Sequence, residues 1–149
     1  MPHVVRPARL ALVAAVLVAG LAGCGFVGAS KTSPHKPDTF LLRGAVAVAL
    51  PADDRRPDGV ACAAAVPGIV AGTPVKVTDP DGRTLGSGRL GDGVVAHDAD
   101  GASCDFPFQI PGVTGGVASY DITVDDRPPQ RFPAKDLREN AAAIIHIRT

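Results

Sequence analysis

Alternation of apolar and polar residues marks most of the chain beyond residue 39 as β-strand. In residues 118–124, Tyr120, Ile122 and Val124 alternate with polar side chains, the period of two expected of a strand with one buried face. Glycine, proline and aspartate separate short apolar runs of this kind, at spacings near ten residues. We therefore expect an all-β fold, a single antiparallel β-sandwich of about seven or eight short strands. The runs are residues 40–50, 75–78, 83–90, 93–96, 104–110, 118–124, 130–132 and 143–147.

Two stretches between these runs have patterns of their own. Residues 79–82 read Asp-Pro-Asp-Gly between two apolar runs, which predicts a tight hairpin. Residues 52–69 are polar at first and then rich in small side chains, so we expect a long irregular loop. Residues 134–143 favour a helix, which Pro133 can start, but the β-branched Ile144 and Ile145 favour a return to extended structure, so we expect at most two turns.

The chain opens with a different pattern. Arg6 and Arg9 precede an uncharged apolar run over residues 10–21, the order of charge and hydrophobicity found in secretory signal peptides. The run is shorter than the roughly 20 residues that span a bilayer, and the glycines that follow it disfavour a stable membrane helix. We therefore expect cleavage and export.

Leu21, Ala22, Gly23 and Cys24 resemble the lipobox of bacterial lipoproteins, an apolar residue and two small residues before an obligatory cysteine. The resemblance implies that residues 1–23 are a lipoprotein signal peptide and that Cys24 carries diacylglycerol and, in many lineages, a further acyl chain such as palmitate. Two or three chains anchor a protein firmly. The expected location is the extracytoplasmic face of the cell membrane. The alternative is an ordinary signal peptide with a chance cysteine.

Residues 24–38 are rich in Gly, Ser, Pro and Lys, which predicts a lipidated tether before a β-sandwich domain of residues 39–149. His35 in this tether is not expected to bind metal. The domain has few aromatic residues, so its core depends on Val, Ile, Leu and Ala, and a covalent cross-link would be useful to it.

Cysteine parity supplies such a cross-link. If Cys24 carries lipid, Cys62 and Cys104 remain, and an exported chain is expected to pair them in a disulfide. A disulfide closing so long a loop contributes about 4 kcal/mol in the chain-entropy model. Two buried free thiols or a redox role are the alternatives, and the wide separation disfavours the second.

Charge argues against nucleic-acid binding. Lys plus Arg equals Asp plus Glu at 15 each, and removing residues 1–23 takes away only two arginines. The charges are interspersed, with no basic stripe for a phosphate backbone. We expect no nucleic-acid partner, and no cofactor.

Several motifs suggest chemistry without completing it. Residues 86–91 spell G-x-G-x-x-G, but no helix follows to meet a pyrophosphate, so we expect a glycine-rich strand and turn. Asp-x-Asp-Gly occurs at residues 79–82 and 98–101 and lacks the further ligands of a calcium loop. His97, Asp98 and Asp100 are weak metal-ligand candidates, and no metal site is expected.

A hydrolase would need a serine with a positioned base. His97 with Ser103 or a nearby aspartate is the strongest combination, but the chain has no G-x-S-x-G motif. His146 alternates with Ile145 and Ile147, so we expect it to be exposed rather than catalytic. The sequence therefore favours a protein that is not an enzyme.

The domain resembles uncharacterised lipoproteins of high-GC actinobacteria. Its order of hairpins and strands is also similar to that of transthyretin-like and carboxypeptidase-regulatory-like sandwiches over most of residues 40–125. The loop around Cys62 and the residues beyond Gln130 depart from that pattern. The motifs that carry the resemblance are Leu42-x-Gly44, Gly72-x-Pro74-Val75-x-Val77, Asp79-x-x-Gly82, Leu85-Gly86, Cys104-x-Phe106-x-Phe108 and Tyr120-x-Ile122-x-Val124.

These features favour a membrane-anchored binding module of the cell envelope that contacts a protein or a cell-wall component through loops, with residues 52–67 as the longest surface. A small envelope hydrolase that uses His97 is one alternative. A carrier of a small apolar ligand, held in a cavity left by the alanine-rich core, is another.

Overall fold

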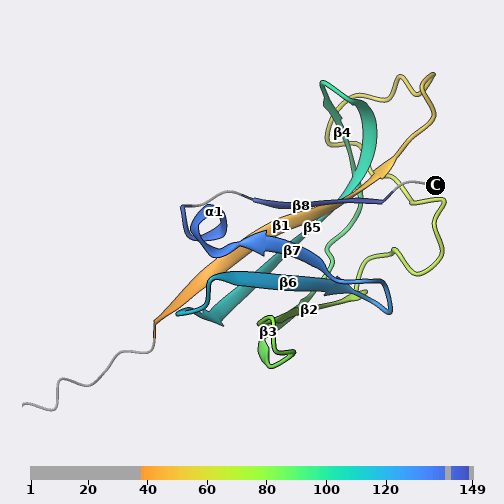
Figure 1. Ribbon diagram of the computed structural model, residues 1–149. Helices are drawn as coiled ribbons and strands as arrows, with labels where there is room; N and C mark the ends of the chain where they lie inside the picture. The colour runs from red at the N-terminus through yellow and green to blue at the C-terminus, as the bar shows by residue number, and fades with distance from the viewer. Residues whose placement is uncertain (1–37, 140–141, 148–149) are drawn as a thin grey trace, which may run out of the picture. The chain divides into compact units, whose positions relative to one another are not determined.

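The computed structural model describes residues 38–139 and 142–147, which form a sandwich of two four-stranded sheets (Figure 1). The predicted signal peptide of residues 1–23 and residues 24–37 of the predicted tether lie outside the described residues. The predicted all-β sandwich is confirmed. Its elements are β1 (Thr39–Ala49), β2 (Pro74–Thr78), β3 (Thr84–Arg89), β4 (Val94–Asp98), β5 (Gly101–Thr114), β6 (Ser119–Val124), β7 (Gln130–Pro133), α1 (Ala134–Arg138) and β8 (Ala143–Ile147).

The two sheets have strand orders β4-β5-β1-β8 and β3-β2-β6-β7. The predicted hairpin at residues 79–82 joins β2 to β3, which are antiparallel. One pair departs from the expected antiparallel arrangement, because β8 runs parallel to β1, from Gly44 opposite Ala143 to Val48 opposite Ile147. The reason is the crossover through α1. It carries the chain from the second sheet to the first, and β8 then starts beside Gly44, in the middle of β1, and runs in the same direction.

The core lies between the sheets and follows the predicted alternation. In β6, Tyr120, Ile122 and Val124 are buried while the residues between them are partly exposed. In β5, Phe106 and Phe108 face the same interior as the buried Cys104. Burial of these side chains stabilises the sandwich by roughly 25 cal/mol for each Å² of apolar surface removed from water.

The glycines of the G-x-G-x-x-G motif allow β3 to pack closely on β5. A Cβ atom on Gly88 would lie 2.8 Å from Cγ1 of Ile110, and one on Gly86 would lie 3.0 Å from Cγ2 of Val113. Distances this short would force the sheets apart. The expected strand and turn are confirmed: residues 86–89 belong to β3, and Gly91 donates a backbone hydrogen bond of 2.7 Å to Pro107 of β5.

The helix predicted within residues 134–143 is the five-residue α1, which agrees with the limit of two turns. Pro133 precedes it in an extended conformation, and Ala134 and Leu137 are its buried residues. In the described part of the chain, no helix is long and apolar enough to cross a membrane.

Candidate functional site

β1 defines two ends of the sandwich. The described chain enters at Asp38, directly before β1, and leaves the strand roughly 35 Å away, after Ala49. The loop of residues 50–69 follows there, and the β4–β5 hairpin lies at the same end because Ala49 is opposite Ser103. We call this the remote end, made of residues 50–62 and 97–103 (Figure 1).

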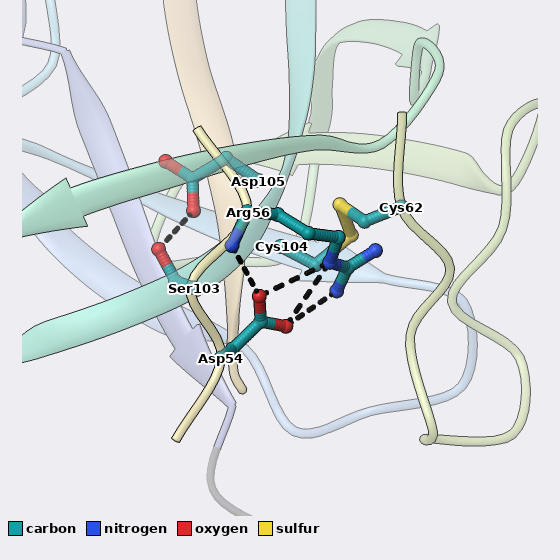
Figure 2. Close-up of a disulfide and its surroundings, with 6 residues drawn as sticks. All are labelled: Asp54, Arg56, Cys62, Ser103, Cys104 and Asp105. Atoms are coloured by element: carbon teal, nitrogen blue, oxygen red, sulfur yellow. Dashed lines mark hydrogen bonds and ion pairs between the residues drawn. A yellow bond between two sulfur atoms is a disulfide. The ribbon is translucent and has the colours of Figure 1, made fainter. Parts of the chain in front are cut away.

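The disulfide between Cys62 and Cys104 fixes the loop of residues 50–69 to the first sheet (Figure 2). Its cysteines are 42 positions apart in sequence, and their Cα atoms are separated by 5.9 Å. Cys104 faces the interior from β5 and is fully buried. Cys62, Ala64 and Val66 pack against the core. The predicted pairing and the predicted loop are therefore both present, and the loop covers part of the inner side of the first sheet.

Backbone hydrogen bonds join the same loop to the free edge of β4. Gly59 N–H donates to the carbonyl of Val95 at 2.8 Å, and Val95 N–H donates to Val60 at 2.8 Å. Cys62 N–H donates to Gly93 at 2.9 Å, and Ala61 forms an isolated bridge with Val94. The loop thus supplies a short additional strand, and residues 53–58 are displayed from a rigid base.

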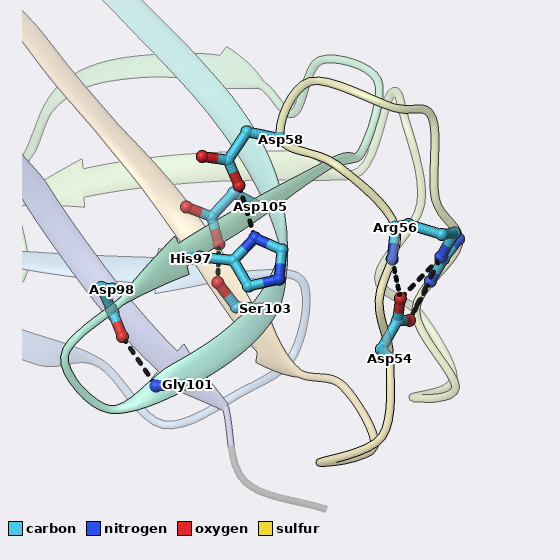
Figure 3. Close-up of polar contacts among 8 residues, drawn as sticks. All are labelled: Asp54, Arg56, Asp58, His97, Asp98, Gly101, Ser103 and Asp105. Carbon is cyan, nitrogen blue, oxygen red and sulfur yellow. Dashed lines mark hydrogen bonds and ion pairs between the residues drawn. The ribbon is translucent and has the colours of Figure 1, made fainter.

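Two polar contacts organise the displayed segment (Figure 3). Asp58 Oδ1 lies 2.5 Å from His97 Nδ1, which ties the segment to β4. Asp54 accepts hydrogen bonds from the backbone N–H and the guanidinium of Arg56, the shortest at 2.6 Å. The side-chain hydrogen bonds from Arg56 lower the pKa of Asp54 to about 2. Asp54 is therefore ionised at neutral pH, and its turn is held together by charge-assisted hydrogen bonds.

The first aspartate of each Asp-x-Asp-Gly motif stabilises a turn. Asp98 Oδ1 accepts from the N–H groups of Asp100 and Gly101, at 2.8 and 3.1 Å. Asp79 Oδ1 accepts in the same way from Asp81 and Arg83. Aspartate commonly makes such contacts in turns.

The metal-ligand candidates do not converge. His97 and Asp98 are consecutive residues of β4, so their side chains leave opposite faces of the sheet. His97 points to Asp58, while Asp98 bonds to its own turn. Among the described residues, no group of three His, Cys, Asp or Glu side chains is placed to hold a metal ion.

The residues of the hydrolase alternative are also separated. His97 is opposite Ala102, and Ser103 is opposite Ala96, so the two side chains lie on opposite faces of the sheet. Ser103 donates a 2.7 Å hydrogen bond to Asp105 on its own face. The structure therefore does not bring His97 to the Ser103 hydroxyl, whose hydrogen-bond acceptor is the Asp105 carboxylate instead.

The outer face of the first sheet carries a shallow groove of about 470 Å³ over Ala47 and Ala49. Asp98 and Ser103 line it from the hairpin, and His146 lines it from β8. His146 is exposed, as its alternation with isoleucines predicted. The groove is open to solvent and so differs from the internal cavity that an apolar carrier needs.

His97 and the loop could be identified as candidates from the sequence, but the contact between them could not. Asp58 is one of several aspartates in a polar stretch, and 39 positions separate it from His97. One local feature of that stretch does predict a contact. Asp54 lies two residues before Arg56, a spacing at which the Asp54 side chain can accept a hydrogen bond from the Arg56 backbone N–H.

Comparison of the chain with protein-family models, with curated proteins and with solved structures found no match.

Proposed function

We propose that this protein is a lipid-anchored binding module on the extracytoplasmic face of a bacterial membrane. Its remote end contacts an envelope protein or a cell-wall component, and no catalysis is involved. The observation that carries the proposal is the position of Asp38 and of the displayed residues 53–58 at opposite ends of β1. An anchor that precedes Asp38 would join the domain at the end of β1 opposite to these displayed residues.

The cysteines support the anchor. The sequence has three, and Cys62 and Cys104 are joined. Cys24 is the third, in the segment that resembles a lipobox. Disulfides persist in oxidising compartments outside the cytoplasm, which agrees with export through the predicted signal peptide of residues 1–23.

The construction of the remote end supports the binding role. Residues 53–58 carry exposed acidic and basic side chains. The residues that follow them, 59–62, are held in place by the disulfide and by backbone hydrogen bonds to β4. Because this support already restricts the loop, less conformational entropy is lost when a partner binds. Loops on a rigid scaffold commonly carry recognition.

Replacing residues 53–58 with a Gly-Ser segment of equal length tests the contact. It leaves Gly59, Val60 and Cys62 in place, so the pairing with β4 and the disulfide survive. Crosslinking in native membranes followed by mass spectrometry should lose at least 90% of the partner crosslinks. An unchanged set of crosslinked partners would rule out the remote end as the contact surface.

Asp81→Ala is the matched control. Asp81 is an exposed aspartate in the β2–β3 turn. This turn lies toward the Asp38 end of the sandwich, because Gly86 of β3 packs over Val113 of β5. Val113 is paired with Phe40, near the start of β1. We expect its crosslinks to equal those of the unsubstituted protein.

Cys24→Ser tests the anchor separately. We expect incorporation of radiolabelled fatty acid to disappear and the protein to leave the membrane fraction. Labelling that persists in the Cys24→Ser protein would place the lipid elsewhere, and no labelling of the unsubstituted protein would refute the anchor.

A further inference from the structure

The sandwich has four edge strands in the described residues, and three of them carry features that discourage pairing with another chain. β4 and the residue before it are covered by backbone hydrogen bonds with Gly59, Val60 and Cys62. β7 has four residues, ends at Pro133 and follows Pro128 and Pro129. β3 carries an extra residue, Leu85, in its pairing with β2 and ends with the charged Arg89. Coverage, proline, short length, bulges and charge are the usual protections of an edge.

β8 is short, at five residues, but carries none of the other protections. Its sequence, Ala-Ile-Ile-His-Ile, contains no proline and no Lys, Arg, Asp or Glu. Its register with β1 is uninterrupted, and within the described residues β1 is the one strand that it pairs with. Ile144 is 38% exposed on its outer face. An open apolar edge of this kind is a template for an added strand.

We infer that the occupant of this edge is β8 of a second copy of this chain, paired antiparallel about a two-fold axis at Ile145. The strand is self-complementary in that arrangement: Ala143 faces Ile147 of the other copy, and Ile144 faces His146. The two inner rows, each made of the buried Ala143, Ile145 and Ile147, then continue into each other. The first sheets of the two copies become one sheet of eight strands.

Symmetry and strand composition favour a second copy over another peptide. An added strand must place apolar side chains in the inner row, and Ala143, Ile145 and Ile147 of β8 supply such a row. Two-fold pairs are the commonest homo-oligomers because each patch meets its own copy. Five residues of strand make an interface below standard size, so the pair depends on a high local concentration, which a shared membrane surface would supply.

Charge reversal at the edge tests the inference in the full-length chain. Two differently tagged copies are expressed together and crosslinked in intact membranes, and one tag is then captured after detergent extraction. Unsubstituted copies should capture each other. Copies that both carry Ile144→Lys and His146→Lys should lose at least tenfold in mutual capture, because like charges would face each other across the axis. Copies that both carry Ile144→Glu and His146→Glu should lose as much.

Mixing the lysine variant with the glutamate variant should restore at least half of the capture, since position 144 of one copy faces position 146 of the other. Leu41→Lys is the control: Leu41 is as exposed as Ile144, at 37%, but lies on β1 away from the edge, and its capture should be unchanged. The inference is refuted if unsubstituted copies do not capture each other, or if the mixed pair recovers nothing. It rests on the proposed membrane anchor but not on the contact at the remote end, so loss of mutual capture in protein that still incorporates fatty acid would refute the pair and leave the proposed function in place.

Discussion

Arg138 donates two hydrogen bonds to the carboxylate of Asp38, one from each Nη atom and each 2.7 Å long. The two residues are 100 positions apart. The Arg138 guanidinium also lies 5.7 Å from the centre of the Phe40 ring, which packs edge-on against Tyr120. The first described residue, assigned to the tether by sequence, is therefore fastened to α1.

Arg138→Ala should lower the melting temperature by no more than about 4 °C, because the ion pair is exposed and such pairs are weak. Arg138→Lys should recover part of the loss, since lysine keeps the charge but lacks the two-pronged contact and the stacking on Phe40. Calorimetry on both variants measures the difference. Equal melting temperatures for alanine and lysine would mean that the geometry of the guanidinium contributes nothing.

Removing the disulfide by Cys62→Ala and Cys104→Ala should destabilise the domain by about 4 kcal/mol, since the denatured chain is no longer constrained. Urea unfolding measures the change. Limited proteolysis should then cut first within residues 50–69, because the loop loses its covalent link to β5. Cuts that start elsewhere would show that the hydrogen bonds to β4 hold the loop without the disulfide.

Acid should weaken the domain through its paired aspartates. Hydrogen bonds from Arg56 lower the pKa of Asp54 to about 2, and those from Arg131 lower the pKa of Asp121. Because the folded-state pKa lies below the unfolded value of about 3.9, the stabilisation is complete above that value. It is lost as pH falls from about 4 toward 2.

The urea midpoint should therefore be level above pH 5 and fall below pH 4. Asp54→Asn should reduce the fall, while Asp53→Asn should not, since Asp53 is exposed and its side chain makes no hydrogen bond with the described residues. An identical fall in the Asp54→Asn protein would remove this pair as a source of acid sensitivity.

Gly88→Ala should cost about 1–3 kcal/mol, because the new methyl group would meet Ile110 at 2.8 Å and overpack the contact between the sheets. Ser87→Ala lies on the exposed face of the same strand and should change stability by less than about 0.5 kcal/mol. Chemical denaturation of the two variants checks the contrast. A Gly88→Ala protein as stable as the Ser87→Ala protein would show that β3 can move away without cost.

The strands and the faces that they bury could be predicted from the order of residue types alone. Alternation in residues 118–124 placed Tyr120, Ile122 and Val124 inward, and the structure has them buried. Turn residues at 79–82 fixed a hairpin, and the wide spacing of Cys62 and Cys104 indicated a disulfide rather than a redox pair. These features depend on local backbone preferences or on residue type, which one sequence carries.

The construction of the two ends of the sandwich depends on contacts between residues that are distant in sequence. The contacts of Asp58 with His97 and of Asp38 with Arg138 join residues 39 and 100 positions apart, and no local pattern records which distant side chains meet. The parallel course of β8 beside β1 likewise follows from the crossover through α1. Periodicity assigns a side chain to a face of its strand, but strand order decides its neighbours. For that reason His97 and Ser103, close in sequence, lie on opposite sides of one sheet.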